Sequence, residues 1–181
     1  MKKIMVDIDG VIADFHTPFL DYVNDRLGGC YTFDDWKGKR LVGMSKDELD
    51  KYHKDFVKSD GYKDIRMIPN ARKGVQHLSQ LRDIVFCTAR PVELAYDTIK
   101  WLQKRNMDYP TYFEKSKIWF CKGRGIDEMV EDEERMLNFA TQCGMSCYGI
   151  LRPYNQDIHK NEKVVVCNGI GAVAEFIEST L

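Results

Sequence analysis

The chain has 181 residues, of which 44% are hydrophobic and 30% are charged, and this composition excludes disordered and fibrous proteins. Lys and Arg number 27 against 28 Asp and Glu, so the net charge of -1 disfavours a protein with an extended nucleic-acid-binding surface. The length fits one domain, or one domain that carries an insertion.

Apolar runs of strand length alternate with segments of helical spacing along most of the chain. We expect the first strand at Lys3–Val6 and further strands at residues 84–87, 117–121, 128–130, 146–151 and 163–167. Helices are expected over residues 71–81, 92–105, 133–143 and 170–181. This alternation predicts an α/β fold, a Rossmann-like three-layer sandwich with a parallel sheet between two layers of helices.

Nearly sixty residues after the first strand interrupt this pattern. They carry helical signals at residues 18–27, 33–36 and 45–57, where Ser45 and Glu48 have the spacing of a capping box. We therefore expect a small helical cap at residues 14–70 and a core of residues 1–13 and 71–181. The cap would emerge from the carboxyl end of the first strand, where parallel sheets bind ligands, and would close over a site there.

Two acidic residues, Asp7 and Asp9, directly follow the first strand. Extended backbone sends alternate side chains to the same side, so the two carboxylates would repel each other unless a proton or a divalent cation relieves them. Gly10 allows a sharp turn and keeps a side chain out of the site. The alternative is a pair of exposed acids in an ordinary Asp-Gly turn.

The ends of later expected strands also carry polar groups. Thr88 and Ala89 offer a hydroxyl and backbone amides that suit an anion, although a Thr at this position is often a cap. Lys122 supplies a cation after residues 117–121, and other nearby cations compete for this role: Lys115, Lys117 and Arg124. Glu131 and Asp132 close the next strand, where the alternative is a solvated start of a helix.

This order of strand ends, acid-x-acid, Thr, Lys and acid-acid, resembles that of the haloacid dehalogenase superfamily of phosphotransferases over essentially the whole core. The resemblance implies that Asp7 attacks phosphorus and forms an aspartyl-phosphate. It implies that Asp9 protonates the departing oxygen and then activates the hydrolytic water.

The same resemblance implies a set of binding residues. Mg2+ would be held by Asp7, the Asp9 carbonyl and Asp132, with Glu131 ligating through water or orienting the other ligands. The phosphoryl oxygens would be held by Thr88, Ala89 and Lys122.

The wider motif over residues 7–15, DIDGVIADF, resembles that of the 5'(3')-deoxyribonucleotidase family. In that family a short helical cap follows, and the aromatic residue at the position of Phe15 flanks the nucleobase. Phe15 could equally be a core residue of the cap helix. Trp36 offers a second aromatic face for a base, although packing between cap and core is the more common use.

Together these features favour a magnesium-dependent phosphomonoesterase acting on nucleoside or deoxynucleoside monophosphates. The alternatives are a polynucleotide 3'-phosphatase, a sugar or metabolite phosphatase, and a catalytically silent nucleotide-binding protein.

The expected partner is a small phosphate monoester rather than a membrane, because no apolar run is long enough to span one. Six scattered cysteines fit reduced thiols, and we expect a cytoplasmic location. Residues 152–155 have no role in this scheme.

Overall fold

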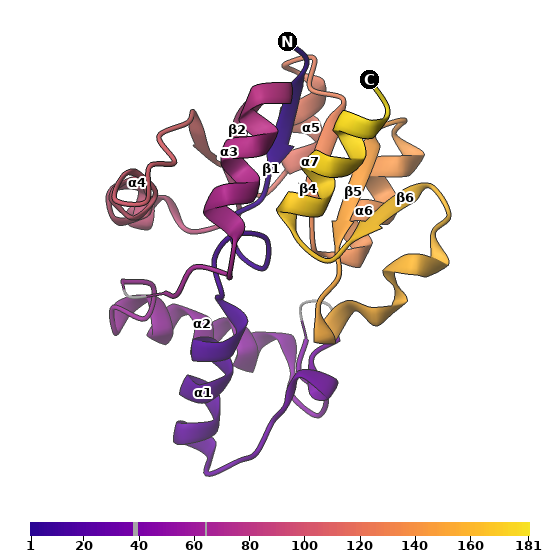
Figure 1. Cartoon of the computed structure of the whole chain (residues 1–181). Helices are drawn as coiled ribbons and strands as arrows, with labels where there is room; N and C mark the ends of the chain where they lie inside the picture. Colours follow the sequence, from indigo (N-terminus) through magenta and orange to yellow (C-terminus); the bar gives the residue numbers. More distant parts are fainter. Residues whose placement is uncertain (38–39, 64) are drawn as a thin grey trace.

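The structure is a computed structural model that describes residues 1–37, 40–63 and 65–181. A six-stranded parallel sheet lies at its centre, with the strand order β3-β2-β1-β4-β5-β6 (Figure 1). The strands are β1 Lys3–Val6, β2 Asp83–Thr88, β3 Thr111–Phe113, β4 Glu128–Glu131, β5 Ser146–Ile150 and β6 Val164–Cys167. The predicted α/β, Rossmann-like fold is confirmed.

Helices cover both faces of the sheet because successive strand residues point to opposite sides. Ile4 and Val6 belong to an apolar core shared with α3, α4 and α7, whereas Met5 belongs to a second core shared with α5 and α6. The helices are α3 Ala71–Leu81, α4 Ala95–Gln103, α5 Lys117–Lys122, α6 Glu134–Gln142 and α7 Ile170–Ser179. Short 3-10 helices lie at Val92–Leu94 (η2) and Pro153–Lys160 (η3).

One strand was predicted in the wrong place. Residues 117–121 form most of helix α5, and the strand at that edge of the sheet is β3. Ile118, Phe120 and Cys121 are buried while Trp119 is 65% exposed. Such a short apolar run does not distinguish a strand from a helical turn, and β3 is short and only partly buried, so its own signal is weak.

The segment between β1 and α3 contains helices α1 His16–Leu27 and α2 Lys46–Lys58 and the 3-10 helix η1 Phe33–Asp35. Figure 1 shows α1 and α2 apart from the sheet, beyond the end of β1. The Ser45 and Glu48 side chains form the predicted capping box at the start of α2. The division into a core of residues 1–13 and 71–181 and a cap of residues 14–70 stays a prediction.

Across the described ranges, no helix combines the length and the apolar character that crossing a membrane requires.

Candidate active site

Three carboxyl groups meet at the carboxyl end of the central strands. Asp7 directly follows β1, Glu131 is the last residue of β4, and Asp132 comes next. Because β1 and β4 are parallel neighbours in register at Val6 and Val130, their ends lie side by side. All three residues are buried, and each offers an oxygen within 4.8 Å of those of the other two. Strands far apart in the sequence therefore build one acidic cluster.

Lys117 supplies the cation of this cluster. Its Nζ lies 2.6 Å from Asp7 Oδ2 and 2.8 Å from Glu131 Oε2, and its side chain is only 5% exposed. Burial acts to lower the pKa of Lys117, but the charges of Asp7 and Glu131 outweigh it and raise that pKa, so the ammonium stays charged.

The expectation for Lys122 needs correction. Its Nζ lies 3.2 Å from Asp127 Oδ1, outside the cluster, and its residue is exposed. An extended segment at residues 117–121 would have delivered Lys122 to the edge of the sheet. Because the segment is helical, its first residue, Lys117, reaches the carboxylates instead. Of the other candidate cations, Lys115 is exposed.

The cluster carries more negative than positive groups, and its pKa values reflect this. Burial first, and then the charge of Glu131, raises the pKa values of Asp7 and Asp132 well above their ordinary range. Burial also acts to raise the pKa of Glu131, but Lys117 and hydrogen bonds lower it to about 2. Three buried carboxyls beside one ammonium favour either a bound proton or a hard cation.

Asp9 lies outside this group of three carboxyls. Its carboxylate accepts two hydrogen bonds from Arg90, whose Nε lies 2.9 Å from Oδ2 and whose Nη2 lies 2.6 Å from Oδ1. Asp7 and Asp9 therefore have different cationic partners although they stand two residues apart. The predicted role of the Asp9 carbonyl toward a metal stays a prediction.

Gly10 shows why the loop after β1 needs a glycine. Its φ is +77°, and a Cβ there would collide with the carboxylate of Asp132 and the hydroxyl of Tyr154. This agrees with the expectation that Gly10 turns the chain and keeps a side chain out of the site.

Thr88 ends β2 and is 1% exposed. Its Oγ1 accepts a hydrogen bond of 3.2 Å from the backbone N–H of Arg90. Ala89 between them is partly exposed. Binding of a phosphoryl group by Thr88 and Ala89 stays a prediction.

Residues 152–155, which had no role in the sequence scheme, hold the acidic loops in place. Arg152 Nε donates to the Gly10 carbonyl at 2.6 Å, and the Tyr154 hydroxyl donates to Asp132 Oδ2 at 2.6 Å. Asn155 Nδ2 donates to the Asp132 carbonyl at 2.7 Å. Residues 152–155 follow β5 closely, and β5 is a neighbour of β4 in the sheet. This position could have indicated that they lie near the acidic loops.

Aromatic side chains of the segment between β1 and α3 pack against one another. Phe15 is 9% exposed, and its ring stacks against Phe19 at 5.2 Å and Tyr62 at 5.3 Å between ring centroids. Trp36 is 5% exposed and packs edge-on against His16 and Phe19. Burial lowers the pKa of His16 to about 4, so this ring is neutral at neutral pH. Contacts of Phe15 and Trp36 with a substrate stay predictions.

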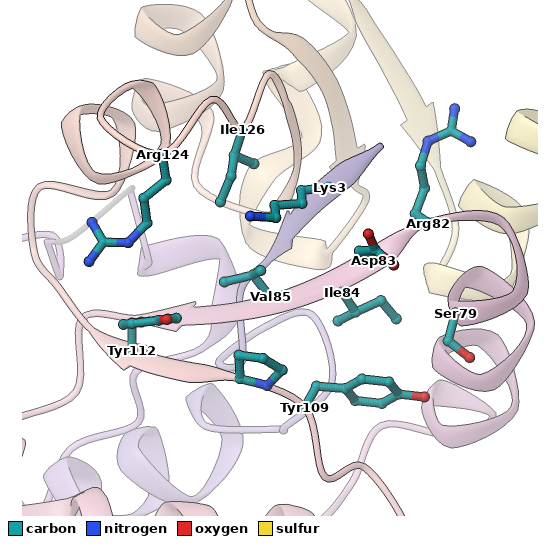
Figure 2. A pocket seen from close by; sticks show the side chains of 11 residues that line it. Lys3, Ser79, Arg82, Asp83, Ile84, Val85, Tyr109, Tyr112, Arg124 and Ile126 are labelled. Carbon is teal, nitrogen blue, oxygen red and sulfur yellow. The ribbon is translucent and has the colours of Figure 1, made fainter. Parts of the chain in front are cut away.

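A separate hollow of about 400 Å³ lies at the other end of the sheet. Figure 2 shows that Lys3, Tyr112 and Arg124 are among its lining residues, together with the first residues of β2. The Arg124 guanidinium lies over the Phe120 ring, 4.2 Å from its centroid, so this candidate cation belongs to the hollow and not to the acidic cluster. Asp83 is the sole carboxylate among the described lining residues, which makes this hollow the poorer candidate for phosphate chemistry.

Comparisons with known proteins show the family to which the chain belongs. Residues 1–170 match the family described as "5' nucleotidase, deoxy (Pyrimidine), cytosolic type C protein". The chain belongs to this family. It is therefore a phosphoric monoester hydrolase of the 5'-nucleotidase type. A Staphylococcus epidermidis protein named "Putative 5'(3')-deoxyribonucleotidase" is 25% identical to it over 143 residues, 75% of this chain and 76% of that protein.

Solved structures show the same fold as this family member. A haloacid dehalogenase-like hydrolase from Streptococcus pneumoniae has a TM-score of 0.71 at 15% identity, over 97% of this chain and 98% of the other. A haloacid dehalogenase-like protein from Agrobacterium tumefaciens has a TM-score of 0.72 at 15% identity, over 99% of both chains.

Proposed function

We propose that this hydrolase is a magnesium-dependent phosphomonoesterase that forms an aspartyl-phosphate on Asp7 and acts on nucleoside or deoxynucleoside monophosphates. The observation that carries the proposal is the buried cluster of Asp7, Glu131 and Asp132 around the Lys117 ammonium. A nucleophilic carboxylate divides one very slow hydrolysis into two easier displacements.

The three carboxyls of the cluster fit Mg2+. They are buried oxygen donors within 4.8 Å of one another, and burial with mutual repulsion raises the pKa values of Asp7 and Asp132. A hard cation with oxygen ligands relieves this repulsion. Asp7 and Asp132 would hold the ion, and Glu131, already bonded to Lys117, would orient its surroundings. When bound, Mg2+ would neutralise charge on the carboxylates and on the phosphoryl group.

The protein's own groups then divide the work. The Asp7 carboxylate attacks phosphorus while Asp9 gives a proton to the departing ester oxygen, and Asp9 later takes a proton from the water that hydrolyses the acyl phosphate. Lys117 takes the role first expected of Lys122, because its ammonium lies 2.6 Å from the nucleophile and can attract the phosphoryl oxygens. Thr88 and Ala89 would complete this phosphate site.

The substrate assignment rests on the family and on the cap segment. The nucleobase would contact the aromatic rings of Phe15 and Trp36, which belong to the same apolar cluster as the first strand. Both rings are nearly buried, so base contact through them requires some opening of the aromatic packing. Six thiols without a disulfide in the described ranges fit a reducing compartment, and we include a cytoplasmic location in the proposal.

Phosphate release provides the test. The full chain should release phosphate from nucleoside or deoxynucleoside monophosphates with Mg2+ and lose this activity in EDTA. Asp7→Asn keeps the shape but removes the attacking charge, and it should reduce turnover by more than about 1000-fold. Asp127→Asn is the matched control at an exposed ion pair and should retain activity.

Substrate competition completes the test. Sugar phosphates and a 3'-phosphorylated oligonucleotide should be poorer substrates than the monophosphates. Turnover that survives Asp7→Asn would overturn the covalent mechanism. A wild-type chain that binds nucleotide but releases no phosphate would overturn the enzyme assignment itself.

A further inference from the structure

Arg90 approaches Asp9 with both arms of its guanidinium. Its Nε and Nη2 donate to the two different carboxylate oxygens of Asp9, at 2.9 Å and 2.6 Å. The Arg90 side chain is 2% exposed, whereas that of Asp9 is 18% exposed. Of the two partners, the guanidinium is therefore the buried one and the carboxylate the more accessible one.

Arg90 is itself held by both the core and the cap segment. Its Nη1 donates to Thr98 Oγ1 of α4 at 3.2 Å, and its backbone N–H donates to Thr88 Oγ1 at the end of β2. Its guanidinium carbon lies 4.8 Å from the ring centroid of Tyr62, whose hydroxyl lies 2.8 Å from Nε2 of His53 on α2. This residue has contacts on several sides, so it can fix the direction of any group that it binds.

We propose that Arg90 is a positioning residue that aims the Asp9 carboxyl at the departing oxygen of the substrate; the inference rests on the proposed function. Two parallel hydrogen bonds fix the plane of a carboxylate and leave lone pairs on its other edge. In this proposal, that free edge of Asp9 faces the substrate. The Nε, Nη1 and Nη2 atoms of Arg90 already donate to Asp9 and Thr98, so the proposal gives Arg90 no contact with the phosphate.

The proposed role concerns one proton in the first displacement. As the bond between Asp7 and phosphorus forms, the bond from phosphorus to the nucleoside oxygen breaks, and the Asp9 proton moves to that oxygen to give an alcohol. A p-nitrophenyl phosphate ester needs no such proton, because nitrophenolate leaves as a stable anion. In the second displacement, Asp9 accepts a proton from water with either substrate, so both esters share this step.

Comparing the two esters isolates the first displacement, because kcat/KM reports only the steps up to transfer of the phosphoryl group. We would measure kcat and KM with Mg2+ for thymidine 5'-monophosphate and for p-nitrophenyl phosphate. Arg90→Met should lower kcat/KM for the nucleotide by about 10- to 100-fold, as misplacement of a reacting group does. For p-nitrophenyl phosphate, kcat and KM should fall together and their ratio should stay within about threefold.

Two further variants separate positioning from general structure. Arg90→Lys keeps the charge but not the fork and should restore part of the nucleotide kcat/KM. Arg82→Met is the matched control, because Arg82 makes a similar buried, forked pair with Glu128, at 2.6 Å and 3.3 Å, at the other end of the sheet. Arg82→Met should lower the free energy of unfolding but should not change the ratio of kcat/KM between the nucleotide and p-nitrophenyl phosphate.

An equal loss of kcat/KM for both esters in Arg90→Met would refute the proposal, since it would indicate phosphate binding or general damage. An unchanged kcat/KM for the nucleotide would refute it as well. If Arg90→Met does not fold, Thr98→Val removes one of the contacts that hold Arg90. It should lower kcat/KM for the nucleotide, but not for p-nitrophenyl phosphate, by a smaller factor. Failure of the proposed function would be recognised separately, by an inactive wild type or an active Asp7→Asn.

Discussion

Replacing Lys117 by Met should destabilise the metal-free protein by about 3 to 5 kcal/mol at neutral pH, the usual cost of breaking a buried ion pair. The Lys117 ammonium lies 2.6 Å from an Asp7 oxygen and 2.8 Å from a Glu131 oxygen, and its side chain is 5% exposed. Methionine fills most of the same space but leaves three buried carboxyls without their cation. The loss is thus electrostatic rather than a loss of packing.

The pKa of Glu131 points in the same direction. Burial acts to raise it, but Lys117 and hydrogen bonds lower it from its ordinary 4.5 to about 2. Because the folded pKa is depressed, this stabilisation is present above the unfolded pKa and is lost as pH falls through the folded one. Without Lys117, burial should raise this pKa, so the variant should be weakest at neutral pH and recover relative to wild type on acidification.

Urea unfolding in EDTA, at neutral and at mildly acidic pH, measures both effects. Lys122→Met is the control, because Lys122 pairs with Asp127 at 3.2 Å where the side chains are 34% and 70% exposed. Such a pair contributes at most about 1 kcal/mol. Equal losses in the two variants, or a Lys117→Met deficit that widens on acidification, would refute this account of the cluster.

Three further predictions concern the same loops. Gly10→Ala should cost about 1 to 3 kcal/mol of stability and most of the phosphate release, because of its φ of +77° and the collision with Asp132; an active variant of normal stability would contradict this. Tyr154→Phe should cost about 1 to 3 kcal/mol in urea unfolding, because Asp132 loses a donor at 2.6 Å; an unchanged midpoint would argue against this hydrogen bond. The metal-free protein should lose thermal stability as pH rises through the raised folded pKa values of Asp7 and Asp132. Mg2+ should make thermal stability depend less steeply on pH. The same pH dependence with and without the ion would exclude binding at these carboxyls.

The acidic half of the site was predictable because it depends on strand ends. Parallel strands bring their carboxyl ends to one edge, so locating β1 and β4 was sufficient to bring Asp7 near Glu131 and Asp132. The choice of Lys117 over Lys122 was not predictable in this way. It depends on whether six residues form a helical turn or a strand, and a short apolar run is compatible with both.

The contacts of Arg90 and Tyr154 could not be predicted from the sequence, for a different reason. Arg90 reaches Asp9 across 81 positions of sequence, and Tyr154 reaches Asp132 across 22. Their roles follow from side-chain reach across the sheet edge, which periodicity does not encode. The strand-end rule identifies the edge at which such residues gather, but not which of them touch.

The different partners of Asp7 and Asp9 bear directly on the proposed reaction. A nucleophile must remain close to an incoming dianion, so cationic charge has to lie beside it, as the Lys117 ammonium does at 2.6 Å. A proton donor must instead present one fixed edge of its carboxyl group to the departing oxygen. The cation paired with that carboxyl group should not bind the phosphate in its place. The Arg90 guanidinium meets that need because its side chain is 2% exposed and donates to both carboxylate oxygens of Asp9. An ammonium in place of the Arg90 guanidinium would not fix the plane of the Asp9 carboxylate in the same way. The proposed covalent mechanism therefore gives each ion pair a separate task, one at the nucleophile and one at the proton donor.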